Sequence, residues 1–523
     1  MDYKQIIEQY LPSMSGAKTY GNLIMQGIPV ENIRSVINHL YNERKLPLKF
    51  ITATDERKEG NGFKIIYIFG IPKENLFLAP YIQLKETEDF PSLMEAIHAA
   101  YGYERKIKTF FGLNPINHIN PAKMILHENW PEGLFPLRKD FHWQSRPAEA
   151  SAPYVFGKVE GEGIYEISVG PVHAGIIEPG HFRFSVAGEE IINLESKLGY
   201  VHKGSEKLFE ILDMNEKVRL SERISGDTSF THSLAFCQAV ESLAEIKPSF
   251  RAKYLRVIYS ELERLANHLN DIGFIMLDTG YSFGGSNGAR LREMIMQINE
   301  RLTGSRFLRG VNVIGGVTKD IPPQTSGDLL EELASIKKDF SEVINIVENS
   351  DTLLNRLKDT GKLGRQIALD HGAVGIAAKG SGIQIDARVD FPYAAYNEIN
   401  VKIATEETND VYARFRVRIK EVFSSVEIIS EALKNMPEGE LSENSAKISL
   451  KKNCYSVDIA EGWRGDIVYF VATDADGNIS RVAVRDPSFV NWAVVGHAVK
   501  GNVVPDFPLI NKSFNLSYSG NDL

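Results

Sequence analysis

Cysteine is the residue whose count most restricts what this chain can fold into. The 523 residues include only two cysteines, Cys237 and Cys454. Two cysteines cannot build a disulfide framework, which suits a chain that folds in a reducing compartment. They also cannot supply a four-thiolate metal site or an iron–sulfur cluster from one chain. Cys237 lies in the helix-like apolar run LAFCQAV and Cys454 in a strand-like segment, so we expect both to be packing residues.

The composition is that of an ordinary soluble globular protein, with 43% hydrophobic and 24% charged residues. A formal net charge of −9 offers no basic footprint for a nucleic acid. No stretch approaches the ~18–20 uninterrupted apolar residues that a membrane span needs. The N-terminal segment MDYKQIIEQYLPS lacks the pattern of a signal peptide, so we expect no export. Any attachment to a membrane would therefore go through partner subunits.

The hydrophobic period changes along the chain and predicts an α+β fold. Apolar, β-branched or alternating runs are typical of strands, and apolar residues spaced by three or four are typical of helices. The expected strands lie at 63–71, 76–84, 181–186, 189–195 and within 447–486. The expected helices lie at 90–113, 254–273, 287–303, 326–360 and 409–435.

A polar, proline-containing stretch, HWQSRPAEASAPY, separates a strand-rich beginning from the helical remainder. We therefore expect a small N-terminal α/β domain at 1–141 and a linker at 142–154. The rest, 155–523, is expected to be a mainly helical domain with small β elements at both ends.

Several long strings carry a resemblance to known families. In the N-terminal part they are ATDER (53–57), YERKIKTFFGL (103–113) and LHENWPEGLFPLRKDF (126–141). In the C-terminal part they are GPVHAGIIEPGHFRF (170–184), LGYVHKGSEK (198–207), LTGSRFLRGVNVIGGV (302–317), DFPYAAY (390–396) and VRDPSFVNW (484–492). Residues 50–141 resemble the 30-kDa subunit of respiratory complex I. Residues 165–523 resemble the large subunit of energy-converting NiFe-hydrogenases of group 4, the formate-hydrogenlyase and hydrogenase-4 type, whose fold also serves as the 49-kDa subunit of complex I.

The nickel–iron centre of the resembled hydrogenases needs four cysteine thiolates, from an R-x-C-G-x-C-x-x-x-H motif and a C-terminal C-x-x-C motif. Here the first motif is RISGDTSFTH (223–232), with Ser225 and Thr228 at the cysteine positions. In SFNLSYSGNDL (513–523), Ser517 and Gly520 take the second pair of positions. A hydroxyl is a hard, weakly acidic donor and does not replace a thiolate at nickel. We therefore expect no nickel–iron centre in this chain, and iron–sulfur clusters in a partner subunit instead.

The resemblance to complex I implies a set of proton-handling residues near the same motif. In that branch, a histidine on a β-hairpin and a tyrosine on the loop equivalent to 223–228 belong to a quinone site. His173 and His181 are both available on the hairpin, and which of them corresponds is open. The tyrosine position falls near Gly226, so the phenol is missing. Asp278 matches a carboxylate that partners the hairpin histidine, and such a pair can hold or relay a proton.

Further candidates are Glu178 in the hairpin loop and His232 at the end of the first motif, because a buried acid or imidazole can carry a proton. Each candidate also has a structural interpretation. The hairpin histidines can bond backbone carbonyls, Asp278 can end a helix, Glu178 can lie on the surface, and His232 can pack inside a helix. We expect Arg485 and Asp486 to form an internal ion pair with a structural role.

Two functions follow from the resemblance. In the first, the chain is a peripheral subunit of an ion-pumping redox complex on the cytoplasmic face of the cell membrane. It would contact an iron–sulfur small subunit and antiporter-like membrane subunits, take part in electron transport and proton translocation, and have a quinone as its candidate ligand. In the second, it is a non-catalytic scaffold between those partners. An open polar channel would favour the first, and a packed apolar plug at Ser225, Thr228 and Ser517 would favour the second.

Overall fold

The N-terminal part is built on a five-stranded sheet in the computed structural model, which describes residues 3–11, 16–85, 87–173, 177–443 and 448–523. The strand order is β1-β2-β5-β4-β3, and β2 and β5 pair in parallel while the other neighbours are antiparallel. The strands are β1 (Lys18–Tyr20), β2 (Leu23–Gly27), β3 (Leu48–Glu56), β4 (Gly62–Ile71) and β5 (Leu76–Leu84). The strand pair expected at 63–71 and 76–84 is confirmed as β4 and β5.

Three helices and a two-stranded parallel sheet complete this part. They are α1 (Tyr3–Tyr10), α2 (Ile33–Asn38), α3 (Tyr101–Phe111), β6 (Asp89–Pro91) and β7 (Asn114–Ile116). The helix expected at 90–113 is wrong in its first half. The backbone N–H of Leu93 and the hydroxyl of Ser92 donate to the buried carboxylate of Glu104, at 2.6 and 2.5 Å, which holds this stretch outside the helix. The end is as expected, because Gly112 caps α3 with φ +73°.

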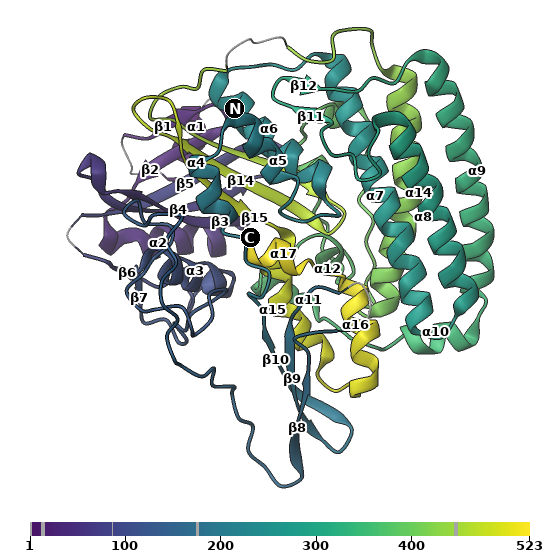
Figure 1. Cartoon of the computed structure of the whole chain (residues 1–523), viewed down its shortest axis with the longest axis horizontal. Helices are drawn as coiled ribbons and strands as arrows, with labels where there is room; N and C mark the ends of the chain where they lie inside the picture. The colour runs from purple at the N-terminus through teal and green to yellow at the C-terminus, as the bar shows by residue number, and fades with distance from the viewer. Residues whose placement is uncertain (1–2, 12–15, 86, 174–176, 444–447) are drawn as a thin grey trace.

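A three-stranded antiparallel sheet projects from the body as an arm (Figure 1). It consists of β8 (Ile164–Val169), β9 (His181–Ala187) and β10 (Glu190–Lys197). The expected hairpin around Gly188 is confirmed as β9 and β10, and Gly188 has the positive φ of +62° that its turn needs. The sequence did not indicate β8 as the third strand. Residues 174–176, which belong to one of the family strings, lie outside the described residues.

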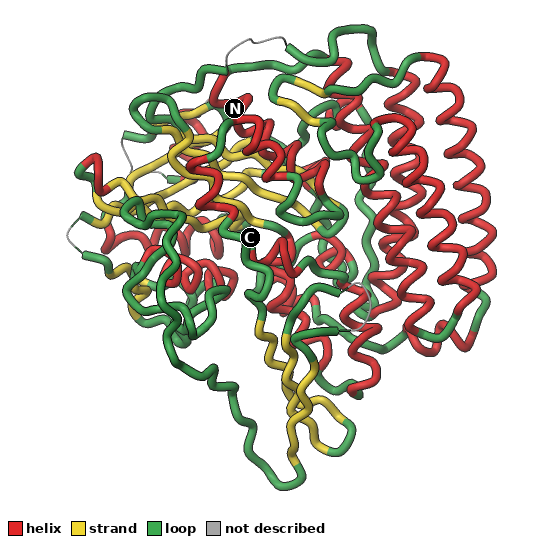
Figure 2. The backbone as a smooth tube through the Cα atoms, in the orientation of Figure 1, coloured by secondary structure: helices red, strands yellow, loops and turns green. Residues whose placement is uncertain are grey.

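Four long helices stand side by side in the C-terminal part (Figure 2): α7 (Phe250–Asp278), α8 (Ser282–Thr303), α9 (Pro323–Glu348) and α14 (Val411–Asn435). The helix expected at 326–360 divides at Ser350, whose hydroxyl caps α10 (Asp351–Leu357). The helix expected at 254–273 is confirmed as the central part of α7, whose side chains are mostly buried. Among the described residues, no helix is both long enough and apolar enough to span a membrane. The shorter helices between and before these four are α4 (Ser205–Ile211), α5 (Met214–Ser221), α6 (Ser229–Ala244), α11 (Arg365–Asp370), α12 (Gly375–Lys379) and α13 (Ala387–Asp390).

A second antiparallel sheet joins the helical body to the N-terminal sheet. Its strands are β13 (Tyr455–Gly462), β14 (Gly465–Thr473) and β15 (Ile479–Arg485), and a short pair is formed by β11 (Asn312–Val313) and β12 (Gly316–Val317). Phe69 of β4 and Phe470 of β14 belong to one continuous hydrophobic core. The chain then ends in α15 (Pro487–Val499), α16 (Phe507–Phe514) and α17 (Tyr518–Asp522). The expected α+β class is confirmed. Along the sequence, strands precede and follow the helical segments of the C-terminal part.

Candidate functional site

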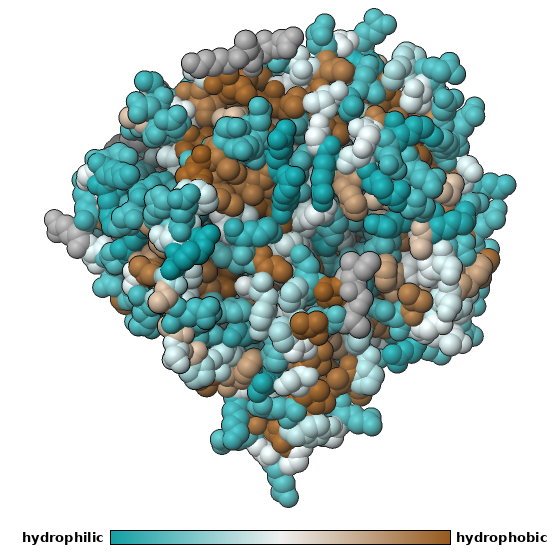
Figure 3. Space-filling model, viewed as in Figure 1, coloured by the Kyte–Doolittle hydropathy of each residue, from teal (hydrophilic) through white to brown (hydrophobic). Residues whose placement is uncertain are grey.

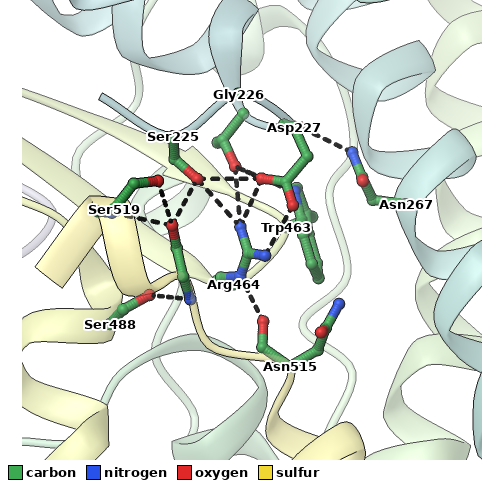
Figure 4. Close-up of polar contacts among 12 residues, drawn as sticks. Ser225, Gly226, Asp227, Asn267, Trp463, Arg464, Ser488, Asn515 and Ser519 are labelled. Atoms are coloured by element: carbon green, nitrogen blue, oxygen red, sulfur yellow. Dashed lines mark hydrogen bonds and ion pairs between the residues drawn. The ribbon is translucent and has the colours of Figure 1, made fainter. Parts of the chain in front are cut away.

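The four positions that correspond to nickel ligands in the resembled family come together in space, because Ser517 contacts Ser225 and Gly520, and Arg464 contacts both Ser225 and Thr228. Figure 4 shows Ser225 among the residues around Arg464. Ser225 and Thr228 lie just before α6, and the Ser517 side chain caps α17. The hydroxyl oxygens of Ser225 and Ser517 are hydrogen-bonded at 2.9 Å, although 292 residues separate them. The backbone N–H of Gly520 donates to the Ser517 oxygen, also at 2.9 Å. Ser519 brings a further hydroxyl within 3.3 Å of Ser517. We call Ser225, Thr228, Ser517 and Ser519 the hydroxyl cluster, and all four are buried.

The guanidinium of Arg464 lies against the hydroxyl cluster. Its Nη1 donates to Asp227 Oδ1 at 2.6 Å and lies 3.2 Å from Thr228 Oγ1 and 3.4 Å from Ser225 Oγ. Its Nη2 donates to Asp227 Oδ2 at 2.8 Å, which makes the ion pair bidentate. Burial raises the pKa of the Asp227 carboxyl, but Arg464 and two hydroxyl hydrogen bonds outweigh it and lower that pKa to about 2. Both charges of the pair are therefore present at neutral pH.

The turn between β13 and β14 places Arg464. The neighbouring Trp463 is buried, its ring lies 3.8 Å from the guanidinium, and its Nε1 donates to Thr228 Oγ1. Gly375, at the start of α12, comes so close to this turn that a Cβ there would lie 1.9 Å from the Arg464 carbonyl oxygen. A glycine with φ +56° is therefore required where α12 meets the turn.

His232 adjoins the hydroxyl cluster through Asp486. Its Nε2 lies 3.0 Å from Asp486 Oδ2, and its Nδ1 lies 3.1 Å from the Tyr469 hydroxyl. Asp486 caps α15 by accepting the N–H of Ser488, and the Ser488 hydroxyl accepts the N–H of Ser517. Burial raises the pKa of the Asp486 carboxyl, but contact with His232 and its other partners makes the net shift downward. The histidine and its carboxylate are both buried.

The ion pair expected between Arg485 and Asp486 is wrong. Arg485 ends β15 and pairs with Asp466 at 2.8 Å, and Asp466 also pairs with Lys49 of the N-terminal part. Consecutive residues at the end of a strand point in opposite directions, which sends Arg485 toward the N-terminal sheet and Asp486 toward His232.

Glu178 reaches the hydroxyl cluster from the loop between β8 and β9. Its carboxylate accepts the backbone N–H of Ser519 at 3.0 Å, while much of the side chain stays exposed. The same loop packs on α17, because a Cβ at Gly180 would lie 2.5 Å from the ring of Tyr518. Glu178 thus joins the arm to the helix that carries Ser517.

The two hairpin histidines bond backbone carbonyls of their own loop. His173 Nε2 lies 2.7 Å from the Gly180 oxygen, and His181 Nδ1 lies 3.3 Å from the Gly170 oxygen. Asp278 is the exposed last residue of α7. Within the described ranges, no hydrogen bond or ion pair joins Asp278 to either histidine. His173 and His181 thus lie as loop histidines and Asp278 lies at a helix end, and a role of the three in proton handling stays a prediction.

A second buried polar cluster lies behind Trp463, and the sequence did not indicate it. Lys379 Nζ lies 2.7 Å from Asp386, 2.8 Å from Glu421 and 3.2 Å from Glu461. His268 Nε2 joins Glu421 at 2.7 Å, and its ring contacts Trp463 edge-on. These residues come from α7, α12, the start of α13, α14 and β13, so only the folded chain brings them together. Arg264 and Arg388 supply further positive charge to these buried carboxylates, because Arg264 pairs with Glu421 at 3.0 Å and Arg388 pairs with Asp386 at 2.7 Å.

The sequence named the four ligand positions, Glu178 and His232, and their role stays a prediction. It did not indicate Arg464 or Asp227 beside them, and it named Asp486 only as a partner of Arg485. Asp227 lies inside the 223–232 motif, and this position was the only feature of the sequence that could have indicated its place in the site. In the part of the chain that the structure describes, no group of three or more His, Cys, Asp or Glu side chains has the arrangement of a metal site.

Comparison with known proteins matches two family models. The respiratory-chain NADH dehydrogenase 49 Kd subunit matches residues 278–460 and 451–522, and the 30 Kd subunit matches residues 27–147. Formate hydrogenlyase subunit 5 of Escherichia coli is 30% identical over 502 residues, which are 95% of this chain and 88% of that protein. Hydrogenase-4 component G of Escherichia coli is 31% identical over 501 residues, 95% of this chain and 87% of that protein. The C/D polypeptide of the NADH-quinone oxidoreductase of Phocaeicola vulgatus is 28% identical over 470 residues, 86% of this chain and 90% of that protein.

Proposed function

The chain belongs to the family of formate hydrogenlyase subunit 5 and hydrogenase-4 component G, and on that premise we propose that it is a nickel-free subunit of a membrane-associated redox complex. The complex would be related to hydrogenases and to NADH-quinone oxidoreductases, with this chain as a peripheral subunit on the cytoplasmic face. Its partners would be an iron–sulfur small subunit and antiporter-like membrane subunits.

The hydrogen bond between Ser225 and Ser517 is the observation that supports a nickel-free site most directly. At 2.9 Å the two oxygens are in contact, and each hydroxyl already has a partner in the protein. The Ser225 hydroxyl also donates to Asp227 at 3.0 Å, and that carboxylate is paired with Arg464, so the polar groups beside Ser225 are already bonded to one another. Nickel of this family needs soft thiolate donors, and the donors here are hydroxyl oxygens and an amide. The residues present therefore do not fit a nickel–iron centre.

Proton handling is the chemistry that the flanking residues support. Glu178 reaches the hydroxyl cluster from the arm, and the His232–Asp486 pair reaches it from α6 and α15. A change of protonation at Glu178 would weaken its bond to the Ser519 N–H and so alter how the arm holds α17. In this way a change of charge at Glu178, beside the hydroxyl cluster, would shift the position of the arm. A quinone is the acceptor suggested by the name of the NADH-quinone oxidoreductase relative.

Exposed apolar side chains support the role of a subunit. Tyr165 of β8 is 51% exposed, and Val172 and Ile177, in the loop between β8 and β9, are 85% and 43% exposed. On the face seen in Figure 3, hydrophobic residues gather beside the strands of the arm, whereas hydrophilic residues cover much of the helical side. Apolar residues that gather on an exposed face are typical of a surface that another protein covers.

A scaffold is the second candidate function, and the closed contacts within the hydroxyl cluster favour it. A scaffold was expected to fill the positions of Ser225, Thr228 and Ser517 with packed apolar side chains. The hydroxyl cluster and the Arg464–Asp227 ion pair occupy this region instead. Buried polar groups are costly unless fully hydrogen-bonded, so a purely structural site gains nothing from them over apolar side chains.

Purification of the tagged chain from membranes of its own host tests membership in the complex. We expect an iron–sulfur small subunit and antiporter-like membrane proteins to copurify in fixed proportion. Recovery of the chain alone would contradict the proposal.

Substitution in that complex separates the two candidate functions. Glu178→Gln and Asp486→Asn are expected to lower proton-coupled turnover of the assembled complex, whereas Glu427→Gln, on the exposed side of α14, is expected to leave it unchanged. Unchanged turnover in all three variants would favour the scaffold.

A further inference from the structure

Three histidines from both parts of the chain meet beside a cavity of about 320 Å³. His98 lies in the turn before α3, His371 ends α11, and His497 lies in α15. His98 and His371 line the cavity, and all three side chains are partly exposed. Solvent in the cavity therefore reaches a group of imidazoles that the proposed function does not use.

His371 and His497 bring two ring nitrogens together. Their Nε2 atoms lie 3.1 Å apart, and their ring centres lie 4.9 Å apart with the ring planes inclined at 61°. Two imidazole nitrogens that each bind one zinc ion at about 2.0 to 2.1 Å are about 3 Å apart, with ring centres about 5 Å apart. A straight N–H···N hydrogen bond of the same length would hold the ring centres farther apart, at roughly 5.4 Å. The two rings are thus inclined to one another, as two ligands of one ion are.

Both imidazoles are in the form that binds a metal ion at neutral pH, because that form is the neutral ring. Burial, together with positive charge on His98 and His497, lowers the pKa of His371 to about 4. Burial and the charge of Lys500 lower the pKa of His497 as well. Each ring can carry its one proton on Nδ1 and direct the lone pair of Nε2 toward the ion.

Carboxylates do not occupy the two nitrogens. Asp370, the neighbour of His371, accepts a hydrogen bond from Gln366, and within the described ranges no ion pair joins a carboxylate to any of the three histidines. The ring centre of His98 lies 4.3 Å from that of His371, but the three rings do not have the arrangement of a complete three-ligand site. Water from the cavity would therefore fill the remaining positions around an ion.

The charged groups in the rest of the cavity wall decide which kind of ion fits. They are Arg105, Lys123, Lys197, Glu128 and Glu195. Three cations and two carboxylates give no excess of negative charge, so the ion would be held by coordination to imidazole and not by charge attraction. Imidazole suits zinc, whereas magnesium and calcium prefer oxygen donors.

We propose that His371 and His497 together bind one zinc ion from solvent, with water in its other positions. The ion connects the end of α11 to α15, the helix that Asp486 caps. Two imidazoles and water hold zinc reversibly, so dialysis removes the ion, and the site differs in this from a thiolate nickel–iron centre. The proposal does not depend on the redox role of the complex.

Calorimetric titration of the purified full chain with zinc chloride at neutral pH tests the proposal. We expect one zinc ion per chain with a dissociation constant of about 1 to 100 µM, and no binding of magnesium. His371→Gln and, separately, His497→Gln are each expected to weaken zinc binding by about tenfold or more. His142→Gln, an exposed histidine outside the group, is expected to bind zinc like the original chain, and the melting temperature of each variant without zinc shows that it is folded.

Absence of saturable binding at millimolar zinc would overturn the proposal. Equal affinity of the His371→Gln and His497→Gln variants and the original chain for zinc would do the same, because the ion would then lie elsewhere. Magnesium binding as tightly as zinc would overturn the assignment to imidazole.

Discussion

Ser517 connects three parts of the molecule through one hydroxyl oxygen. It accepts the N–H of Gly520 as the cap of α17, contacts Ser225 before α6, and lies beside Ser519, whose N–H binds Glu178 of the arm. The hydrogen bonds of Ser517 thus connect the start of α6 with α17, the two segments that carry the four ligand positions. The stability of the site therefore depends on single hydroxyls.

Replacing this hydroxyl gives the first prediction. Ser517→Ala removes the cap of α17 and the bond to Ser225, and we expect it to lower the free energy of unfolding by about 2 kcal/mol. Ser350→Ala removes the cap of α10, at a less buried position, and is expected to cost about half as much. Urea unfolding measures both, and an equal or smaller effect of Ser517→Ala would contradict the central position of its hydroxyl.

Asp227 gives a pH dependence. Its folded pKa of about 2 lies below the value near 3.9 of an unfolded aspartate, so its stabilising contribution is present above pH 4. It is lost as the pH falls from about 4 toward 2. Asp227→Asn is therefore expected to be less stable than the original chain at pH 7 and to lose less stability over that acid window. Parallel pH profiles of unfolding for the two chains would refute this.

At the residue scale, the sequence was informative where the family motif has fixed spacing. Ser225, Thr228, Ser517 and Gly520 could be named because the motif places each of them. Arg464 could not, because its carboxylate partner is 237 residues away and only the meeting of the β13–β14 turn with the 223–232 loop brings them together.

At the scale of elements, the site depends on how closely α12 approaches the β13–β14 turn. The backbones of Gly375, at the start of α12, and Gly465, at the start of β14, are in contact there. Arg464 directly precedes Gly465 in the turn. Elements with a clear period were predicted well, such as β4, β5 and α14. Element boundaries that depend on side-chain hydrogen bonds were not predicted. At Ser92, a hydrogen bond to Glu104 keeps the chain outside the helix. At Ser350, the capping side chain starts a new helix where the sequence predicted one continuous helix.

A substitution at Gly375 tests this close approach. Gly375→Ala adds a Cβ 1.9 Å from the Arg464 carbonyl at a positive φ, and we expect it to cost more than about 2 kcal/mol of stability. Gly327→Ala is the matched control, since it lies in α9 with no atom within 4 Å of the new Cβ. The control is expected to be neutral or to stabilise by up to about 1 kcal/mol. Similar melting temperatures for the two variants would contradict the prediction.

At the scale of the whole molecule, the N-terminal and C-terminal parts share one hydrophobic core and several buried ion pairs. The division into 1–141, 142–154 and 155–523 stays a prediction from the sequence. Three histidines also meet across these parts: His98 lies 4.3 Å from His371 between ring centres, and His371 Nε2 lies 3.1 Å from His497 Nε2. Nothing in the spacing of the three along the sequence indicated this contact.

The histidine contact predicts acid sensitivity. Burial, with the charges of His98 and His497, lowers the pKa of His371 to about 4. An unfolded histidine titrates near 6.5, so the folded chain loses stability as the pH falls from about 6.5 to 4. His371→Gln is expected to reduce that loss, and His142→Gln, at an exposed position, is expected to leave it unchanged. Urea unfolding between pH 7.5 and 4 measures the difference, and identical slopes for all three chains would disprove it.

The nickel content of the purified full chain tests the central claim most directly. The chain would be produced in its own host with nickel added to the medium, purified without chelators, and examined by elemental mass spectrometry. Because the four ligand positions carry hydroxyls or glycine and Arg464 lies against them, we predict far less than one nickel per chain. One tightly held nickel per chain would contradict the account.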